Sequence, residues 1–338
     1  MQLRKKPHRL FTLFNWQPRK EQSPKNYFLQ QPVELVMLVT DYLTPVDLCL
    51  LSQTCWVLRS ILGKRGTTTG LLYAEHLSYL TYRARGLPEE WACEECMTLH
   101  PIIKTDTPAS IHGMTCPFKR NTVGIHTLRQ ILDNECLLQN KFRIAQRHVQ
   151  LALKYARLQR HEYDSCLQAL TAPHHNANFG PAERIPLKTH FSAYPKIIAG
   201  PNGDLRFLLL STWRYYKGTE DICVPGLGQQ IICPHLYTYR AIDPKLRRPL
   251  LHFGIFESVV NQALKARGQV RAGSCTLCAT DFAVRLSSEY LDLHVWQDLG
   301  PECYPIDLAW HQGHLAYPCL EVYNSTWNSN SIWDTNLT

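Results

Sequence analysis

The stretch YPKIIAGPNGDLRFLLLSTWRYY, residues 194–216, decides the fold of the second half of the chain. Two apolar runs flank the turn residues Asn202 and Gly203, and an Asn-Gly pair tolerates the positive φ angles of a tight hairpin turn. A second hairpin is predicted where apolar residues alternate over 282–286 and 291–295. These hairpins predict a β-rich antiparallel domain over 173–318, interrupted by one helix over 256–267.

Helical periodicity dominates the chain before this domain. Apolar residues recur at helical spacing over 69–85 and again over 141–171, so residues 64–172 are expected to form a mainly helical segment. Helices followed by antiparallel strands place the whole chain in the α+β class.

Residues 31–62 predict three short helices. Leu35, Leu38 and Val39 share one helical face. The run Thr44-Pro45-Val46-Asp47 then restarts a helix, with Thr44 as N-cap and Asp47 reaching back as in a capping box. Gly63 stops the last of the three.

The formal net charge of +8 is concentrated near the N-terminus. Six basic residues precede any acidic one: Arg4, Lys5, Lys6, Arg9, Arg19 and Lys20. Residues 1–26 are therefore expected to form a flexible basic arm, and residues 319–338, rich in Asn, Ser and Thr, a flexible tail. The region between them carries little excess charge, so we do not expect a nucleic-acid binder.

The apolar runs of the sequence are short. Leu10–Phe14 is shorter than a signal-peptide core, and no run approaches the ~18 to 20 apolar residues of a membrane span. The expected location is cytoplasmic or nuclear, without secretion or a membrane partner. In a reducing compartment the thirteen cysteines are expected to be thiols or metal ligands and not disulfides.

The sequence QPVELVMLVTDYLTPVDLCLLSQTCWVLRSIL, residues 31–62, resembles an F-box within a module over 27–63. That family shows a Leu-Pro-x-Glu-Leu opening, a Tyr-Leu pair, an Asp-Leu pair, and a Cys followed by an aliphatic residue and Arg. Gln31 departs from the aliphatic residue expected at the start. The matching positions are Pro32, Glu34, Leu35, Tyr42, Leu43, Asp47, Leu48, Leu51, Cys55, Leu58 and Arg59.

The resemblance implies a substrate-receptor subunit of an SCF-type ubiquitin ligase, which would bind a Skp-type adaptor, through it a cullin scaffold, and an unknown target. So short a segment cannot bury all its leucines within itself, which agrees with docking on a partner. A helical cap folded onto the rest of the chain is the alternative. The residues expected to contact the adaptor are Pro32, Leu35, Leu38, Leu43, Leu48, Leu51, Cys55 and Leu58.

The remainder resembles, more loosely, a group of fungal F-box proteins with Cys-x-x-Cys motifs. Those motifs correspond here to Cys93–Pro101, Cys233–Leu236 and Cys275–Phe282. The resemblance implies an architecture and no particular target.

Two sets of residues have the composition of structural zinc sites. A Cys-x-x-Cys spacing lets both thiolates point at one tetrahedral zinc ion, at about 2.3 Å. The first set is Cys93, Cys96, His100 and Cys116, in which His112 or His126 could replace Cys116. The second set is Cys233, His235, Cys275 and Cys278. A mixed site of the two Cys-x-x-Cys pairs and simple packed thiols remain alternatives.

Catalytic motifs are absent from the sequence, so we do not expect an enzyme. A redox role for Cys93 and Cys96 is disfavoured, because Glu94 and Glu95 between them raise a thiol pKa. The second functional hypothesis is a zinc-stabilised interaction protein that acts outside a ligase and associates with nucleic acid through its basic arm.

Overall fold

The computed structural model describes residues 27–93, 96–110, 142, 144–179, 187–200, 203–218, 221–228, 231–233, 236–238 and 253–302. The predicted arm (1–26), the predicted tail (319–338) and the candidate ligands Cys116 and His235 lie outside them. The chain divides into two compact units, Met1–Gly70 and Leu71–Thr338. The described residues combine helices with antiparallel sheet, which confirms the mixed α+β class.

The first unit contains helices α1 (Val33–Thr40), α2 (Pro45–Ser52) and α3 (Trp56–Leu62), followed by the 3-10 turn η1 (Gly63–Gly66). The predicted capping box is present at the start of α2. The Thr44 hydroxyl accepts a hydrogen bond from the Asp47 amide (3.2 Å), and the Asp47 carboxylate accepts one from the Thr44 amide (3.3 Å).

A small core holds these helices together. Its buried apolar residues come from all three helices and include Val36, Leu48, Leu58 and Leu62. Ser52 lies at the contact between α2 and η1, where its hydroxyl donates to the Gly66 carbonyl (2.7 Å). A side chain at Gly66 would lie 2.5 Å from Ser52 Cβ, so this close approach requires glycine.

The second unit begins with helix α4 (Tyr73–Arg85) and a small hairpin of strands β1 (Glu90–Cys93) and β2 (Thr98–Pro101). The helix starts later than the predicted Thr69. At its actual start the Glu75 carboxylate accepts a hydrogen bond from the Leu72 amide (2.9 Å). The hairpin was not predicted within the segment 64–172.

The helical pattern predicted over 141–171 becomes α6 (Gln146–Leu158), η2 (His161–Tyr163) and α7 (Asp164–Leu170). Gln159 adopts a left-handed conformation (φ 50°) and ends α6, which explains the interruption.

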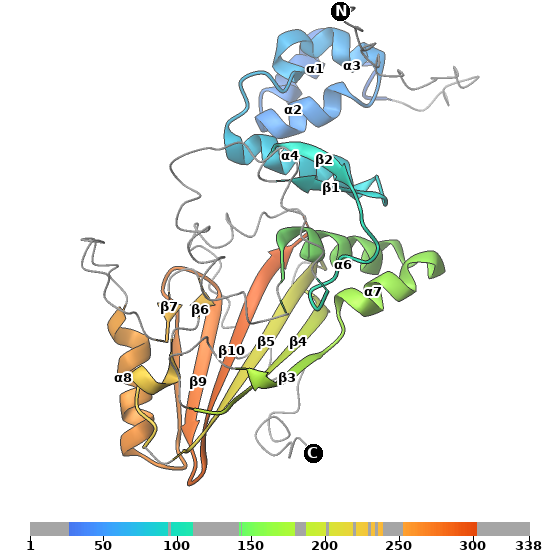
Figure 1. Ribbon diagram of the computed structural model, residues 1–338. Coiled ribbons are helices and arrows are strands. Elements are labelled where there is room, and N and C mark those ends of the chain that lie inside the picture. The colour runs from blue at the N-terminus through green and yellow to red at the C-terminus, as the bar shows by residue number, and fades with distance from the viewer. Residues whose placement is uncertain are drawn as a thin grey trace, which may run out of the picture. The chain divides into compact units, whose positions relative to one another are not determined.

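Six antiparallel strands form the main sheet in the order β3-β4-β5-β10-β9-β8 (Figure 1). The strands are β3 (His174–Phe179), β4 (Thr189–Ala199), β5 (Leu205–Tyr216), β8 (Val270–Ser274), β9 (Thr280–Leu286) and β10 (Tyr290–Pro301). Both predicted hairpins, β4–β5 and β9–β10, are confirmed, and Gly203 has the expected positive φ of 76°.

Smaller elements lie between β5 and β8. They are η3 (Pro225–Leu227), strands β6 (Ile231–Cys233) and β7 (Leu236–Tyr237), and helix α8 (Phe253–Lys265). The predicted helix over 256–267 is confirmed with a shift towards the N-terminus. None of the described helices is long and apolar enough to cross a bilayer.

The main core lies on one face of the sheet, under α6 and α8. Alternate residues of the central strands point into it, including Phe207 and Trp213 of β5 and Leu293 of β10. Val149 and Leu153 of α6 belong to the same core, so the helical segment predicted over 64–172 shares its interior with the sheet. The opposite face has a smaller apolar cluster of Leu208, Leu210, Ala283 and Trp296.

Candidate metal centres

The described cysteines and histidines form two groups that could hold a metal ion, and within each group the ligand atoms lie within 4.8 Å of one another. We call Cys93, Cys96 and His100 the hairpin centre, and Cys233, Cys275 and Cys278 the core centre. Each group keeps three of the four ligands predicted from the sequence. The two Cys-x-x-Cys pairs fall into separate groups, so the structure does not bring the four thiols of the mixed site together.

The turn between β1 and β2 builds the hairpin centre. Cys93 is paired with Thr98 and Trp91 with His100. Met97, in the turn, has a positive φ of 58°, and its amide donates to the Cys93 carbonyl (3.1 Å). The tight turn therefore places the two thiols and the imidazole at one end of the hairpin.

Distances within the hairpin centre are short. Cys96 Sγ lies 2.9 Å from His100 Nε2 and 2.8 Å from Thr98 Oγ1. Cys93 is buried, whereas Cys96 and His100 are partly exposed. Burial lowers the pKa of His100, which favours the neutral imidazole, the form that binds metal ions.

Two side chains of helix α6, Gln150 and Lys154, form hydrogen bonds with the backbone that precedes the hairpin centre. The Gln150 side-chain amide donates to the Ala92 carbonyl and accepts from the Ala92 amide, both at 3.1 Å. The Lys154 ammonium donates to the carbonyls of Leu87 and Glu90. Burial lowers the pKa of Lys154 to about 8, with partial compensation by the charge of Glu302. These contacts fix the backbone that precedes Cys93.

Three thiols from distant segments form the core centre. Cys233 ends β6, and Cys275 and Cys278 lie on the turn between β8 and β9. The side chains are 1%, 6% and 6% exposed and belong to the main core. A metal ion here would join the β6–β7 pair to the edge of the main sheet.

The turn that carries Cys275 and Cys278 is held by its own hydrogen bonds. The Cys275 amide donates to the Thr280 carbonyl, and the Thr280 amide donates to the Cys278 carbonyl, both at 2.8 Å. The Leu277 amide donates to Cys275 Sγ (3.4 Å). An N–H directed at this sulfur stabilises a thiolate, as hydrogen bonds to charged groups generally do.

Gly273 lies on β8, two residues before Cys275. In the structure a Cβ at Gly273 would lie 2.6 Å from the Phe282 ring, so its importance is close packing of β8 against that ring.

The core centre could hold a metal ion in place of a thiol proton. Hydrogen bonds with Cys233 and Cys275, together with burial, raise the pKa of the Cys278 thiol. Cys278 therefore stays protonated without a metal, and a bound cation would have to displace its proton. None of the nine described cysteines forms a disulfide. Cys116, His112, His126 and His235 lie outside the described residues.

The residues predicted to contact an adaptor divide into two classes. Leu48 and Leu58 are buried within the first unit. The remainder stay accessible: Pro32, Leu35 and Leu38 are exposed, and Leu43, Leu51 and Cys55 are partly buried. The sequence pattern did not select Val33, Tyr42, Trp56 and Val57 as contact residues, although they are also exposed.

Comparisons with family models, with curated proteins and with solved structures find no match for the chain. The resemblance to an F-box therefore remains a prediction from residues 31–62.

Proposed function

We propose that the chain is the substrate-receptor subunit of an SCF-type ubiquitin ligase, and that its first unit docks on a Skp-type adaptor and through it on a cullin scaffold. The carrying observation is the apolar surface of the first unit, here called the docking face. It consists of Val33, Leu35, Leu38, Val39, Tyr42 and Trp56. In this proposal the chain supplies proximity to its target, and other subunits carry the chemistry.

The exposure of the docking face supports this role. Leu35 and Leu38 are 47% and 55% exposed, and Tyr42 and Trp56 are 86% and 74% exposed. Leu35, Leu38 and Val39 follow one another at the i, i+3, i+4 spacing of a single side of α1. Scattered exposed apolar residues are ordinary, but a grouped set on one helix is typical of an interaction surface.

Removal of side chains from the docking face tests the proposal. The double variant Leu35→Ala, Leu38→Ala should keep the wild-type thermal midpoint and lose co-purification with the adaptor, because both side chains are exposed. Tyr82→Ala, an exposed apolar site at 41% in the second unit, is the matched control and should bind normally. Co-purification of the double variant at the wild-type level would overturn the proposal.

Leu48 serves as the contrasting position. It is 7% exposed, so Leu48→Ala should cost about 2 to 5 kcal/mol of unfolding free energy as a core truncation. A loss of adaptor binding in this variant reports on folding, and only the exposed pair reports on docking.

We infer that the ion of both centres is zinc, in a structural role. Thiolates with imidazole are ligands that zinc binds tetrahedrally, and burial of the core centre leaves little access for substrate. Elemental analysis of protein purified without added metal tests this inference: about two zinc ions per chain support both centres, and metal-free folded protein that resists a strong chelator contradicts it.

A second candidate is a zinc-stabilised interaction protein outside any ligase, favoured by the two cysteine centres alone. Salt dependence separates the candidates. Association with nucleic acid through basic residues weakens steeply with salt, whereas apolar docking of the first unit on an adaptor should persist.

A further inference from the structure

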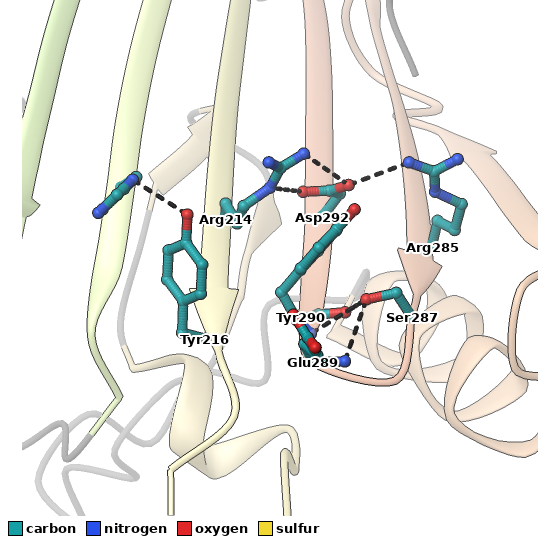
Figure 2. Close-up of polar contacts among 8 residues, drawn as sticks. Arg214, Tyr216, Arg285, Ser287, Glu289, Tyr290 and Asp292 are labelled. Carbon is teal, nitrogen blue, oxygen red and sulfur yellow. Dashed lines mark hydrogen bonds and ion pairs between the residues drawn. The ribbon is translucent and has the colours of Figure 1, made fainter. Parts of the chain in front are cut away.

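A row of ionisable side chains crosses four strands on the face of the sheet opposite the main core. His190 of β4 pairs with Arg214 of β5, Arg214 with Asp292 of β10, and Asp292 with Arg285 of β9. Cross-strand partners lie side by side on the same face of a sheet. Figure 2 shows the Asp292 carboxylate between the guanidinium groups of Arg214 and Arg285.

The acid of this row is buried and the two cations are more exposed. Arg214 donates from Nε to Asp292 Oδ1 (2.7 Å) and from Nη2 to Oδ2 (3.2 Å), and Arg285 Nη2 donates to Oδ2 (3.3 Å). The Asp292 side chain is 3% exposed and each arginine side chain 21%. One carboxylate faces two guanidinium groups, so the accessible part of the row is positively charged.

Aromatic rings and a further cation border the row. Tyr216 and Tyr290 are cross-strand partners, and the Arg214 guanidinium lies 4.1 Å from the centre of the Tyr290 ring. Lys188 Nζ lies 5.7 Å from the centre of the Tyr216 ring. The Ser287 hydroxyl accepts from the Tyr290 amide (3.0 Å) and so fixes the turn beside it, as Figure 2 shows.

The neighbouring His190 of β4 lies beside two cations of the site, Lys188 and Arg214. Burial, together with the charges of Lys188 and Arg214, lowers the pKa of His190. Its Nδ1 lies 3.2 Å from the Tyr216 hydroxyl, whereas its buried Nε2 has no hydrogen-bond partner among the described residues. Burial is the largest cause of this pKa shift, and the charges of Lys188 and Arg214 act in the same direction.

We propose that Arg214 and Arg285, assisted by Lys188, bind an oxyanionic group of a ligand, a carboxylate or a phosphate. Guanidinium groups bind both through paired, charge-assisted hydrogen bonds. Asp292 is a positioning residue, because it takes one side of each guanidinium and holds the two next to each other. The tyrosines bound the site laterally. This site lies in the second unit and does not depend on adaptor docking by the first.

Titration of the full chain with inorganic phosphate and, separately, with glutarate tests the proposal. The thermal midpoint is followed at constant ionic strength, so that general salt effects cancel. Wild-type protein should show a saturable rise, and the anion with the lower apparent Kd identifies the preferred group. In Arg285→Gln the apparent Kd should rise ~10-fold or more, as expected for loss of a charged donor.

Arg271→Gln is the matched control. Arg271 lies on the neighbouring strand β8, and its partner Val284 belongs to the main core, so it faces away from the row. It should titrate like wild type. Lys188→Gln, at an exposed position, keeps the test valid if Arg285→Gln fails to fold, and it should also weaken binding. Equal midpoint shifts in wild type and all three variants would overturn the proposal and leave the row as a structural ion cluster.

Discussion

The hairpin centre and the core centre share the Cys-x-x-Cys spacing but differ in how far along the chain their ligands lie. The ligands of the hairpin centre, Cys93 to His100, all come from one turn and its two short strands. Those of the core centre combine Cys233 of β6 with the pair Cys275 and Cys278 after β8. The first group is partly exposed, and the second is inside the main core.

This difference predicts different energetic roles for a bound ion. Closing a loop removes conformational freedom from the unfolded chain, and the effect grows with the logarithm of loop length. An ion at the core centre closes the long segment between Cys233 and Cys275, whereas one at the hairpin centre closes a single turn. We therefore expect the core centre to stabilise the second unit and the hairpin centre to order its local backbone.

The largest expected effect is at Cys278. Cys278→Ser should lower the unfolding free energy by ~4 kcal/mol or more, the class of metal loss, and remove one zinc equivalent. Denaturant unfolding with elemental analysis measures both. Cys166→Ser is the control, because Cys166 is partly buried against the same core but belongs to neither centre. This variant should keep the wild-type zinc content. Retention of two zinc ions by Cys278→Ser would refute the core centre.

A comparison of the two centres by acid unfolding must first account for the protonation of His294, which lowers stability by itself. Burial lowers its pKa to about 4, and the charges of Arg285 and Arg214 act in the same direction, against that of Asp292. Between pH 6.5 and 4 the unfolded chain takes up a proton that the folded chain does not, so unfolding free energy falls, by about 3 kcal/mol in total. His294→Gln should flatten this part of the stability curve; an unchanged slope would assign it to other groups.

Gln150 offers a way to loosen the hairpin centre without touching a ligand. Gln150→Leu removes both hydrogen bonds to Ala92 and leaves two buried backbone groups unpaired, at a cost of about 2 kcal/mol. Amide hydrogen exchange at Ala92 and Cys93 should accelerate, while exchange in β8 and β9 should not change. Equal acceleration in both places would mean that the two centres unfold together.

The smallest expected effect is at Cys96. Cys96→Ser should remove one zinc equivalent and lower the unfolding free energy by only about 1 kcal/mol. The Cys96 side chain is partly exposed, and all ligands of the hairpin centre lie close together in the sequence. The same experiment in Cys223→Ser, an exposed cysteine outside both groups, gives the baseline. A loss as large as that of Cys278→Ser would remove the proposed distinction between the centres.

Local chemistry in this chain was readable from the sequence. The capping box of Thr44 and Asp47 and the Gly203 turn each depend on residues within a few positions, and both are present. Each Cys-x-x-Cys pair could be predicted for the same reason, because its two cysteines lie within four residues. The β1–β2 hairpin was missed, because its strands are short and its turn uses the positive φ of Met97, which no composition rule anticipates.

Long-range pairing was not readable. The sequence could not place Arg214 beside Asp292, because the register between β5 and β10 is set by the whole sheet. It also gave no reason to separate Leu48, which is buried, from Leu35, which is exposed, since both lie on apolar helical positions. The motifs alone grouped Cys233 with Cys275 and Cys278, and in the structure their sulfur atoms lie within 4.8 Å of one another.

The position of β5 and β10 at the centre of the sheet has a consequence for synthesis on the ribosome. The strand that contains Tyr216 is paired on both sides only after Tyr290, about 75 residues later, has been synthesised. At ~5 to 20 residues per second, the β4–β5 hairpin has an open edge for several seconds. An unpaired strand edge is a template for association with other chains. Nascent chains stalled between residues 216 and 290 should therefore be the species that most needs a chaperone.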